Sequence, residues 1–270
     1  MLTFEGVSYR YAGAERASLR DVELELHDGE VVGLAGANES GKSTLCLLAS
    51  GLAPRSIGGT LTGRILLDGV PTAGRPMHEL AARIGIAFQN PGTQLSGVTA
   101  TVYEEVAFGP MNLGLPLADV IGRTRQALVI LGIDALAERD PARLSGGQQQ
   151  LTAIASLLAM RPRHLVLDDP TAQLDPAGTR MVGDALARLA REGTSILVAE
   201  HKTDLLADLV SRVVVLASGR VALDGPARSV LGDPRLLELG VAEPSGVRLA
   251  RLAREAGLPQ HALDLAAASA

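Results

Sequence analysis

The stretch G-A-N-E-S-G-K-S-T at residues 36–44 decides the fold of this 270-residue chain. Its spacing, G-x-x-x-x-G-K-[ST], surrounds phosphates with backbone N–H groups, brings a lysine to the outer phosphates and offers a hydroxyl to Mg²⁺. Residues 30–35 before it are almost all apolar, and a helical pattern begins at Thr44. The loop therefore joins a buried parallel strand to a helix N-terminus, which predicts a nucleotide-binding loop in an α/β protein.

The loop itself supplies most of the predicted nucleotide contacts. Lys42 is expected to reach the β and γ phosphates, and Ser43 to bind Mg²⁺. A carboxylate at Glu39 would repel phosphate, but because backbone N–H groups surround the phosphates, we expect this side chain to point outward. A dinucleotide-binding fingerprint, G-x-G-x-x-G with an acidic residue after the next strand, does not match. The predicted contacts are Gly36, Asn38, Glu39, Ser40, Gly41, Lys42, Ser43 and Thr44.

Apolar runs elsewhere predict a parallel sheet covered by helices on both faces. They lie at 83–89, 164–168, 195–199 and 212–216. Residues 2–11 and 22–27 alternate apolar and polar side chains, as half-buried strands do. The predicted fold is an α/β P-loop NTPase with a parallel-sheet core, an N-terminal antiparallel β subdomain and an inserted helical subdomain. We assign the ATPase domain to 1–225, its helical insert to about 90–143, and a C-terminal helical tail to 226–270.

Composition bears on three features: a nucleic-acid partner, the state of the cysteine, and segments for export or membrane insertion. The net charge of −5, without a long basic run, argues against a nucleic-acid partner. The single Cys46 cannot form an internal disulfide, and its apolar helical surroundings predict a buried thiol. We expect no signal peptide and no membrane-spanning segment, since no apolar run approaches the ~18 residues that a span needs.

Two acidic residues close the apolar run at 164–168. Asp168 is predicted to hold Mg²⁺, directly or through water, and Asp169 to orient the water that attacks the γ-phosphate. Two acidic residues before Pro170 are equally typical of a helix or turn start. The motif L-S-G-G-Q at 144–148, which opens a helical run, favours the first interpretation. With these motifs in this order, nearly the whole chain resembles the ATP-binding cassette (ABC) family.

That resemblance implies a head-to-tail dimer of ATPases, in which the L-S-G-G-Q motif of one closes over ATP held by the other. Ser145, Gly146, Gly147 and Gln148 would then contact ATP, at a helix start suited to phosphate. It also implies an adenine-stacking role for Tyr11, with Tyr9 as the competing candidate. The other implied roles are sensing Mg²⁺ or the attacking water for Gln89, contacting the second ATPase for Asp175, and contacting the γ-phosphate for His201. We expect the other four histidines at the surface.

Asp169 departs from the family, which normally has glutamate there. Aspartate is one methylene shorter, and a displacement near 1 Å can cost on the order of 10²-fold in rate. We therefore expect this site to bind ATP and to hydrolyse it slowly. The intact L-S-G-G-Q would complete a faster site on a different partner ATPase, which makes a heterodimer.

Shorter stretches are similar to the ATPases of energy-coupling-factor importers. They are Q-N-P-G-T-Q at 89–94, A-E-H at 199–201 and the segment 239–252. This similarity implies a transmembrane coupling protein, a membrane substrate-binding protein for vitamins or transition metals, and a peripheral location on the cytoplasmic face of the membrane. Two alternatives remain: a soluble ABC ATPase of cofactor or cluster assembly, and a regulatory ATP-binding subunit with slow hydrolysis.

Overall fold

The strand before the phosphate loop, β3 (Val31–Gly36), lies inside a six-stranded sheet of order β10-β9-β3-β8-β7-β6. The structure is a computed structural model that describes residues 1–257. All neighbouring strands are parallel except β10, which runs antiparallel to β9 at one edge, so the predicted parallel core is confirmed. The other strands are β6 (Ile84–Ala87), β7 (His164–Asp168), β8 (Ser195–Ala199), β9 (Arg212–Ala217) and β10 (Arg220–Pro226).

The central strands are apolar because helices or the second sheet cover both of their faces. Every residue of β3 and β8 is buried. The register pairs Leu34 with Ala199 and Asp168 with Ala199, so the carboxyl ends of β3, β7 and β8 meet at one edge. Ligands of open parallel sheets bind beyond this edge, which is where the phosphate loop begins.

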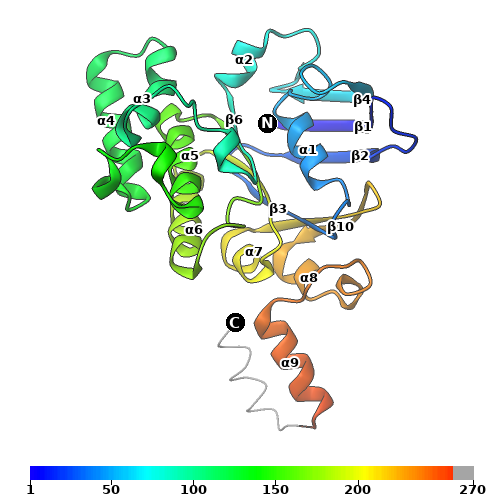
Figure 1. Ribbon diagram of the computed structural model, residues 1–270. Helices are drawn as coiled ribbons and strands as arrows, with labels where there is room; N and C mark the ends of the chain where they lie inside the picture. The colour runs from blue at the N-terminus through cyan, green and yellow to red at the C-terminus, as the bar shows by residue number, and fades with distance from the viewer. Residues whose placement is uncertain (258–270) are drawn as a thin grey trace.

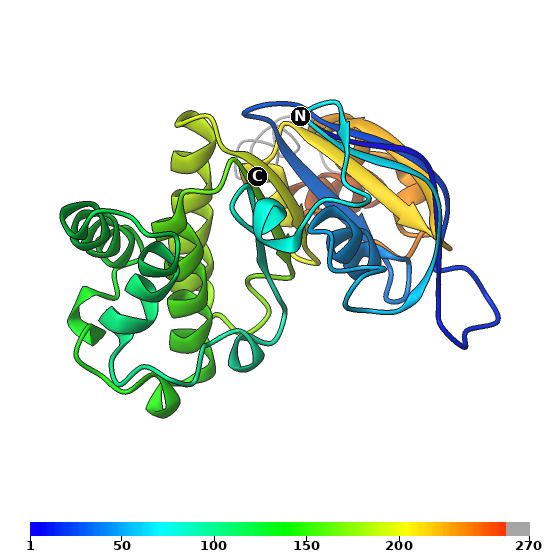
Figure 2. The same ribbon diagram turned by 90° about the horizontal axis from the view of Figure 1, so that it is seen from above.

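A second, antiparallel sheet has the order β2-β1-β4-β5 and confirms the N-terminal β subdomain. Its strands are β1 (Leu2–Tyr11), β2 (Leu19–Leu26), β4 (Gly59–Leu67) and β5 (Val70–Pro71). Helix α1 (Lys42–Ala49) packs in one buried cluster with residues of both sheets, as the first two views indicate (Figures 1 and 2). Cys46 lies fully buried on this helix, and its burial raises the pKa of the thiol well above its ordinary value.

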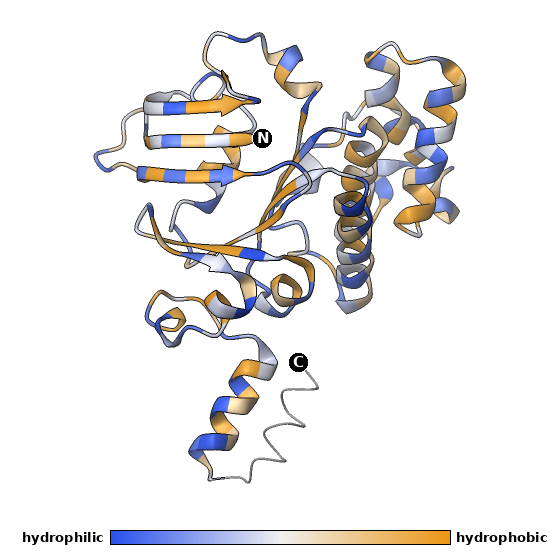
Figure 3. Ribbon diagram, turned by 180° about the vertical axis from the view of Figure 1, so that it is seen from behind, coloured by the Kyte–Doolittle hydropathy of each residue, from blue (hydrophilic) through white to orange (hydrophobic). Residues whose placement is uncertain are grey.

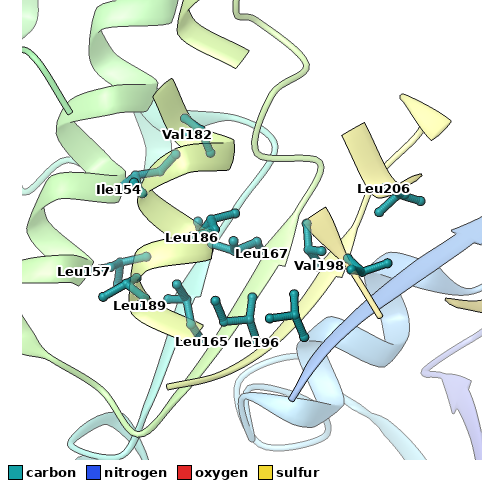
Figure 4. Packing of buried hydrophobic residues seen from close by; sticks show 14 of the residues in the cluster. Ile154, Leu157, Leu165, Leu167, Val182, Leu186, Leu189, Ile196, Val198 and Leu206 are labelled. Carbon is teal, nitrogen blue, oxygen red and sulfur yellow. The ribbon is translucent and has the colours of Figure 1, made fainter. Parts of the chain in front are cut away.

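The opposite face of the six-stranded sheet forms the second core. Helices α5 (Gly146–Met160) and α6 (Pro176–Arg191) pack there against β7 and β8. Figure 4 shows Ile154 and Leu157 of α5 facing Val182, Leu186 and Leu189 of α6, with the strand residues beside them. Helix α7 (Thr203–Leu209) adds Leu206 to the same cluster.

A helical lobe stands beside the sheets, seen in green in Figure 2. It contains α3 (Val102–Asn112) and α4 (Leu117–Ile130), both within the predicted insert, and both contact α5. The packed helical layer therefore extends beyond residue 143, because α5 serves the lobe and the sheet together. Short elements complete this part: α2 (Met77–Ala81) and 3-10 turns at Pro91–Thr93, Asp134–Leu136 and Pro141–Arg143.

The C-terminal part begins after β10 with α8 (Ala227–Leu231), a 3-10 turn at Pro234–Leu236 and α9 (Ser245–Glu255). Hydrophilic and hydrophobic residues alternate along the α9 ribbon (Figure 3), and Leu249 and Leu252 of this helix are exposed. Residues 258–270 of the predicted tail lie outside the described residues. Within residues 1–257, no helix has the length and apolarity needed to cross a bilayer.

Candidate functional site

The phosphate loop turns sharply between β3 and α1, and two glycines make the turn possible. Gly36 and Gly41 have φ angles of 153° and 110°. A Cβ atom at Gly36 would lie 2.5 Å from the Leu216 carbonyl oxygen, and one at Gly41 would lie 2.9 Å from that of Ser18. Because a side chain fits at neither position, glycine at both keeps the loop backbone close to its neighbours and free for a ligand.

Glu39 adopts a left-handed conformation, with φ at 62°. This region is uncommon for a residue with a side chain and costs about 1–3 kcal/mol. The Glu39 side chain is exposed, as expected of a carboxylate that points outward, although the residue still borders the cavity described next.

A cavity of about 680 Å³ opens at the sheet edge where β3, β7 and β8 end. The structure brings together here most of the predicted loop residues, both aspartates, Gln89 and His201. No motif in the sequence indicated six further lining residues, which are Arg16, Ala17, Ser18, Arg20, Ser218 and Gly219. The lining residues are Arg16, Ala17, Ser18, Arg20, Asn38, Glu39, Ser40, Gly41, Lys42, Ser43, Thr44, Gln89, Asp168, Asp169, His201, Ser218 and Gly219.

The side chain of Lys42 hydrogen-bonds to the backbone of the phosphate loop. Its Nζ donates to the carbonyl oxygens of Gly36 at 2.7 Å and Ala37 at 3.0 Å, and the residue is 8% exposed. Burial lowers the pKa of Lys42, and the Asp168 and Asp169 carboxylates oppose that shift. Within residues 1–257 no carboxylate forms a direct ion pair with this ammonium, which leaves it available to an anionic ligand.

Ser43 and Asp168 provide a pair of oxygen ligands at the cavity floor. The Ser43 hydroxyl donates to Asp168 Oδ1 at 3.1 Å. Burial raises the pKa of Asp168, while this hydrogen bond and Lys42 lower it. Hydroxyl and carboxylate oxygens are hard ligands of the kind that Mg²⁺ prefers, so this pair fits Mg²⁺.

Asp169 follows β7 with a left-handed φ of 51° and meets Gln89 across the cavity. Gln89 Nε2 donates to Asp169 Oδ2 at 3.2 Å. Burial raises the pKa of Asp169 to about 7, and the nearby Glu200 and Asp168 carboxylates add to the shift. Such a perturbed carboxyl group, close to a lysine and facing a cavity, is typical of a catalytic position.

His201 follows β8 and lines the same cavity with an exposed side chain. Burial of part of its ring and the nearby Lys42 lower the pKa of His201, against the opposing Glu200 and Asp168 carboxylates, which favours the neutral imidazole. A neutral imidazole can donate one hydrogen bond and accept another.

The signature residues do not line this cavity. Ser145 caps α5: its Oγ accepts from the Gln148 N–H at 3.3 Å, and Gln148 Oε1 accepts from the Ser145 N–H at 3.1 Å. This capping box satisfies the helix start locally while Ser145 and Gly146 stay exposed. Asp175 caps α6 in the same way, accepting from the Gly178 N–H at 2.7 Å, and is also exposed.

The two tyrosine candidates differ in burial. Tyr9 is 1% exposed, and its hydroxyl donates to the Ile57 carbonyl at 2.9 Å, so it belongs to the core. Tyr11 is half-buried, packs edge-on against Tyr9 with ring centroids 5.0 Å apart, and pairs its hydroxyl with Thr44 Oγ1 at 3.0 Å. Tyr11 is thus the more accessible ring, beside the cavity rather than in its lining, and its adenine role stays a prediction.

The expected surface position is wrong for His164, which is fully buried at the start of β7. Both ring nitrogens lack a hydrogen-bond partner among the described residues, and burial lowers the pKa of His164 to about 4. Asp28 and Asp68 lie nearby, but the Met1 amino group and Arg163 already pair with both carboxylates.

Sequence reasoning also missed Glu200 and Lys202, which flank His201. Glu200 is 1% exposed, yet its carboxylate accepts hydrogen bonds from Thr171 and from two backbone N–H groups. One signal was present in the sequence: Glu200 directly follows four apolar strand residues, where burial is expected, and a buried carboxylate needs hydrogen-bond partners.

The fold and the cavity together define a P-loop ATPase with a parallel sheet. The profile of the family described as ABC transporter matches residues 19–172, more than half of the chain. An energy-coupling factor transporter ATP-binding protein, EcfA1 of Symbiobacterium thermophilum, is 42% identical over 266 residues, covering 94% of this chain and 90% of the relative. The chain therefore belongs to the ABC transporter family and is an ABC ATPase.

Two solved structures share the fold over most of its length. The first is cbiO1 from Clostridium perfringens, described as part of the ABC transporter complex cbiONQ; its TM-score is 0.77 at 32% identity, covering 95% of this chain and 98% of that one. The second is an ATP-binding cassette solved as a dimer in a post-hydrolysis state with ADP and Pi. Its TM-score is 0.74 at 27% identity, covering 84% of this chain and 99% of that one.

Proposed function

We propose that this chain is the ATP-hydrolysing subunit of an importer of the energy-coupling-factor type. The observation that carries the proposal is the convergence of Lys42, Asp168, Asp169 and His201 on one cavity at the sheet edge. The similarity to EcfA1, over 94% of this chain, supports this branch of the family. The cargo is a vitamin or a transition-metal ion, and its selection belongs to another subunit.

In this proposal the cavity binds ATP with Mg²⁺. The loop N–H groups and Lys42 hold the phosphates, while Ser43 and Asp168 hold the metal, which polarises the γ-phosphate. Asp169 and Gln89 orient the attacking water, since their side chains already meet at 3.2 Å. His201 contacts the γ-phosphate, and Tyr11 stacks on adenine.

The second half of each ATP site comes from a second ATPase. Ser145, Gly146, Gly147 and Gln148 are proposed to reach the γ-phosphate of that partner, and Asp175 to contact it. Supporting this, Ser145 and Gly146 are exposed, and their helix start is ready to bind an anion. We propose a heterodimer because Asp169 is shorter than glutamate, so that a site on the partner carries the faster hydrolysis.

The helical lobe is proposed to receive the membrane subunits, a transmembrane coupling protein and a substrate-binding protein. Large apolar side chains stay exposed on α3, α4 and the connection between them: Met111 is 61% and Leu117 71% exposed. Helices of a membrane partner would cover such a surface, and closure of the ATPase dimer would then move that partner. The chain would lie peripherally on the cytoplasmic face of the membrane.

Asp169 also favours a second candidate, a regulatory subunit in which ATP clamps the dimer and is hydrolysed slowly. Its carboxyl group is short, and burial raises its pKa to about 7. Turnover by the assembled complex separates this candidate from an importer with one fast site.

The test is affinity purification of the tagged chain from gently solubilised native membranes, with its companions identified by mass spectrometry. We expect a second ATPase and small integral membrane proteins. Met111→Glu should lose the membrane proteins and keep the second ATPase, whereas Val70→Glu, at a 45% exposed residue of the antiparallel sheet, should keep all of them. Recovery from the soluble fraction alone, without a membrane partner, would overturn the importer and favour a soluble ATPase of cofactor or cluster assembly.

A further inference from the structure

Three buried or half-buried side chains connect the end of β8 to the segment that leads into α6. Glu200 is 1% exposed, and its Oε2 accepts from the Thr171 hydroxyl at 2.6 Å. Its Oε1 accepts from the backbone N–H groups of His201 at 2.8 Å and Lys202 at 3.1 Å. The Glu200 carboxylate thus holds the backbone at His201. It also holds the side chain of Thr171, two residues after Asp169.

Lys202 makes the second half of the connection. Its Nζ donates to the Thr171 carbonyl at 2.8 Å and to Thr179 Oγ1 at 2.9 Å, with the Leu174 carbonyl at 3.5 Å. Thr171, which is fully buried, is therefore held through its hydroxyl by Glu200 and through its carbonyl by Lys202. Thr179 lies in the first turn of α6, whose start is capped by Asp175.

The composition of the chain supports a specific role for this lysine. Of the 25 basic residues, lysine occurs at positions 42 and 202 alone, and all the others are arginine. An ammonium is a compact charge that donates in three directions, whereas the planar guanidinium of arginine cannot meet three oxygens around one point. Lys42 belongs to the phosphate loop, and Lys202 contacts Thr171.

We propose that Glu200, Thr171 and Lys202 form a brace that couples His201, which lines the ATP cavity, to Asp175, which faces the second ATPase. This rests on the proposed function of the cavity. Glu200, Thr171 and Lys202 are positioning residues: they act through His201 and through the segment 171–175, and none of them lines the cavity. Contact of His201 with the γ-phosphate would then be transmitted to the dimer surface through hydrogen bonds instead of through a flexible loop.

The activity test uses the chain in its purified complex. Thr171→Val keeps the shape of the side chain and removes its hydroxyl, so we expect kcat to fall about tenfold with KM for ATP within about twofold. Thr171→Ser, which restores a hydroxyl, should be close to the wild type. The matched control is Thr124→Val in α4, where the buried hydroxyl has no partner among the described residues. It should leave kcat and KM within about twofold.

A double-mutant cycle distinguishes a brace from two separate contacts. Lys202→Met should lower kcat about as much as Thr171→Val, and Lys202→Arg should not restore it. The double variant should lose no more than the worse single variant, because either change opens the same connection. Losses that multiply, or single variants within about twofold of the wild type, would overturn the proposal.

Amide hydrogen exchange tests the brace without any ATPase activity. The His201 and Lys202 amides donate to Glu200, so Thr171→Val should speed exchange at 200–203 and at 171–178 by about tenfold, and Thr124→Val should not. Unchanged exchange in both segments would overturn the brace. If the wild-type complex neither binds nor hydrolyses ATP, the proposed function fails, while the exchange result still decides whether the two segments are coupled.

Discussion

The chain carries two half-sites that differ in how complete they are. The phosphate-loop half gathers Lys42, Asp168, Asp169 and His201 around one cavity, and burial shifts the pKa of each of them. The signature half, at the start of α5, is exposed and satisfies its polar groups within its own capping box. In the first half, charged groups are partly buried and a bound ligand can compensate their lost hydration. In the second half, the polar groups already have hydrogen-bond partners and remain accessible to another molecule.

This difference indicates that ATP binding depends on the phosphate-loop half, whereas turnover also depends on the signature half. The groups around the cavity are already ordered and partly desolvated in the folded chain. They can therefore bind a ligand without a further change in structure. A relaxed helix start contributes only when another molecule brings the phosphate to it. Changes in the two halves should therefore fail in different ways.

The largest effect is expected from Lys42→Ala in the phosphate-loop half. It removes the cation that reaches the outer phosphates, so ATP binding at this chain's own site should weaken strongly, and hydrolysis there, measured with the partner site inactivated, should fall about 10³-fold. Equilibrium binding of a fluorescent ATP analogue and steady-state turnover measure both. Tight binding by this variant would contradict the assigned role of the cavity.

Gly146→Asp in the signature half should keep ATP binding and lower turnover about 10²-fold, because a carboxylate would then face the partner's γ-phosphate. The same two assays compare it with Lys42→Ala, and Gly122→Asp on the exposed side of α4 is a control. Loss of binding in Gly146→Asp would break the division between the two halves.

Asp169→Glu tests the shortened carboxylate. Extending the side chain by one methylene should raise hydrolysis at the site that contains Asp169 between 10- and 10²-fold, with little change in ATP affinity, when turnover is measured in a complex whose partner site has been inactivated. Asp208→Glu, at an exposed position of α7, controls for the added methylene. An unchanged rate would show that hydrolysis at this site is not limited by the length of Asp169.

The dependence of stability on pH should come from the buried His164, which lies outside both half-sites, at the end of β7 away from the cavity. Its pKa is lowered to about 4, so below pH 6.5 the unfolded chain binds a proton that the folded chain does not. Stability is therefore lost as the pH falls from about 6.5 to 4. Between pH 7.5 and 5.5, His164→Leu should gain about 1.4 kcal/mol relative to the wild type in urea unfolding, a tenfold change in the equilibrium constant. The exposed His27→Leu should not, and parallel pH profiles for wild type and His164→Leu would contradict the assignment.

The smallest effect is expected from Glu39→Gly. Because the Glu39 side chain is exposed, the ATP dissociation constant should change by less than about threefold, while the strain of the positive φ is relieved. Thermal unfolding and ATP titration together measure this. An affinity gain above about tenfold would mean that the carboxylate does repel the phosphates.

The sequence predicted best those elements whose pattern is continuous. The runs at 164–168 and 195–199 coincide with β7 and β8, because strands buried on both faces are mostly apolar. Strand β4 (Gly59–Leu67) went unidentified, since its exposed threonines and glycines hide the alternation. The phosphate loop and the acidic pair were predictable because each is formed by residues that are close together in the sequence.

Long-range packing explains what the sequence did not reveal. Thr171 and Glu200 are far apart in the chain and meet because β7 and β8 pair in register. The burial of His164 likewise depends on its neighbours across the sheet. Neither contact leaves a periodic pattern, so spacing alone could not identify it.

The buried Cys46 has a practical consequence for spectroscopy. Because its thiol is fully buried and its pKa is raised, thiol reagents at neutral pH should leave it unmodified in the folded chain. A single cysteine introduced at the exposed Ser56 or Ala142, outside the proposed ATP contacts, could then carry a spin label without removal of the native thiol. Distances between such labels would follow the opening and closing of the ATPase dimer through its cycle.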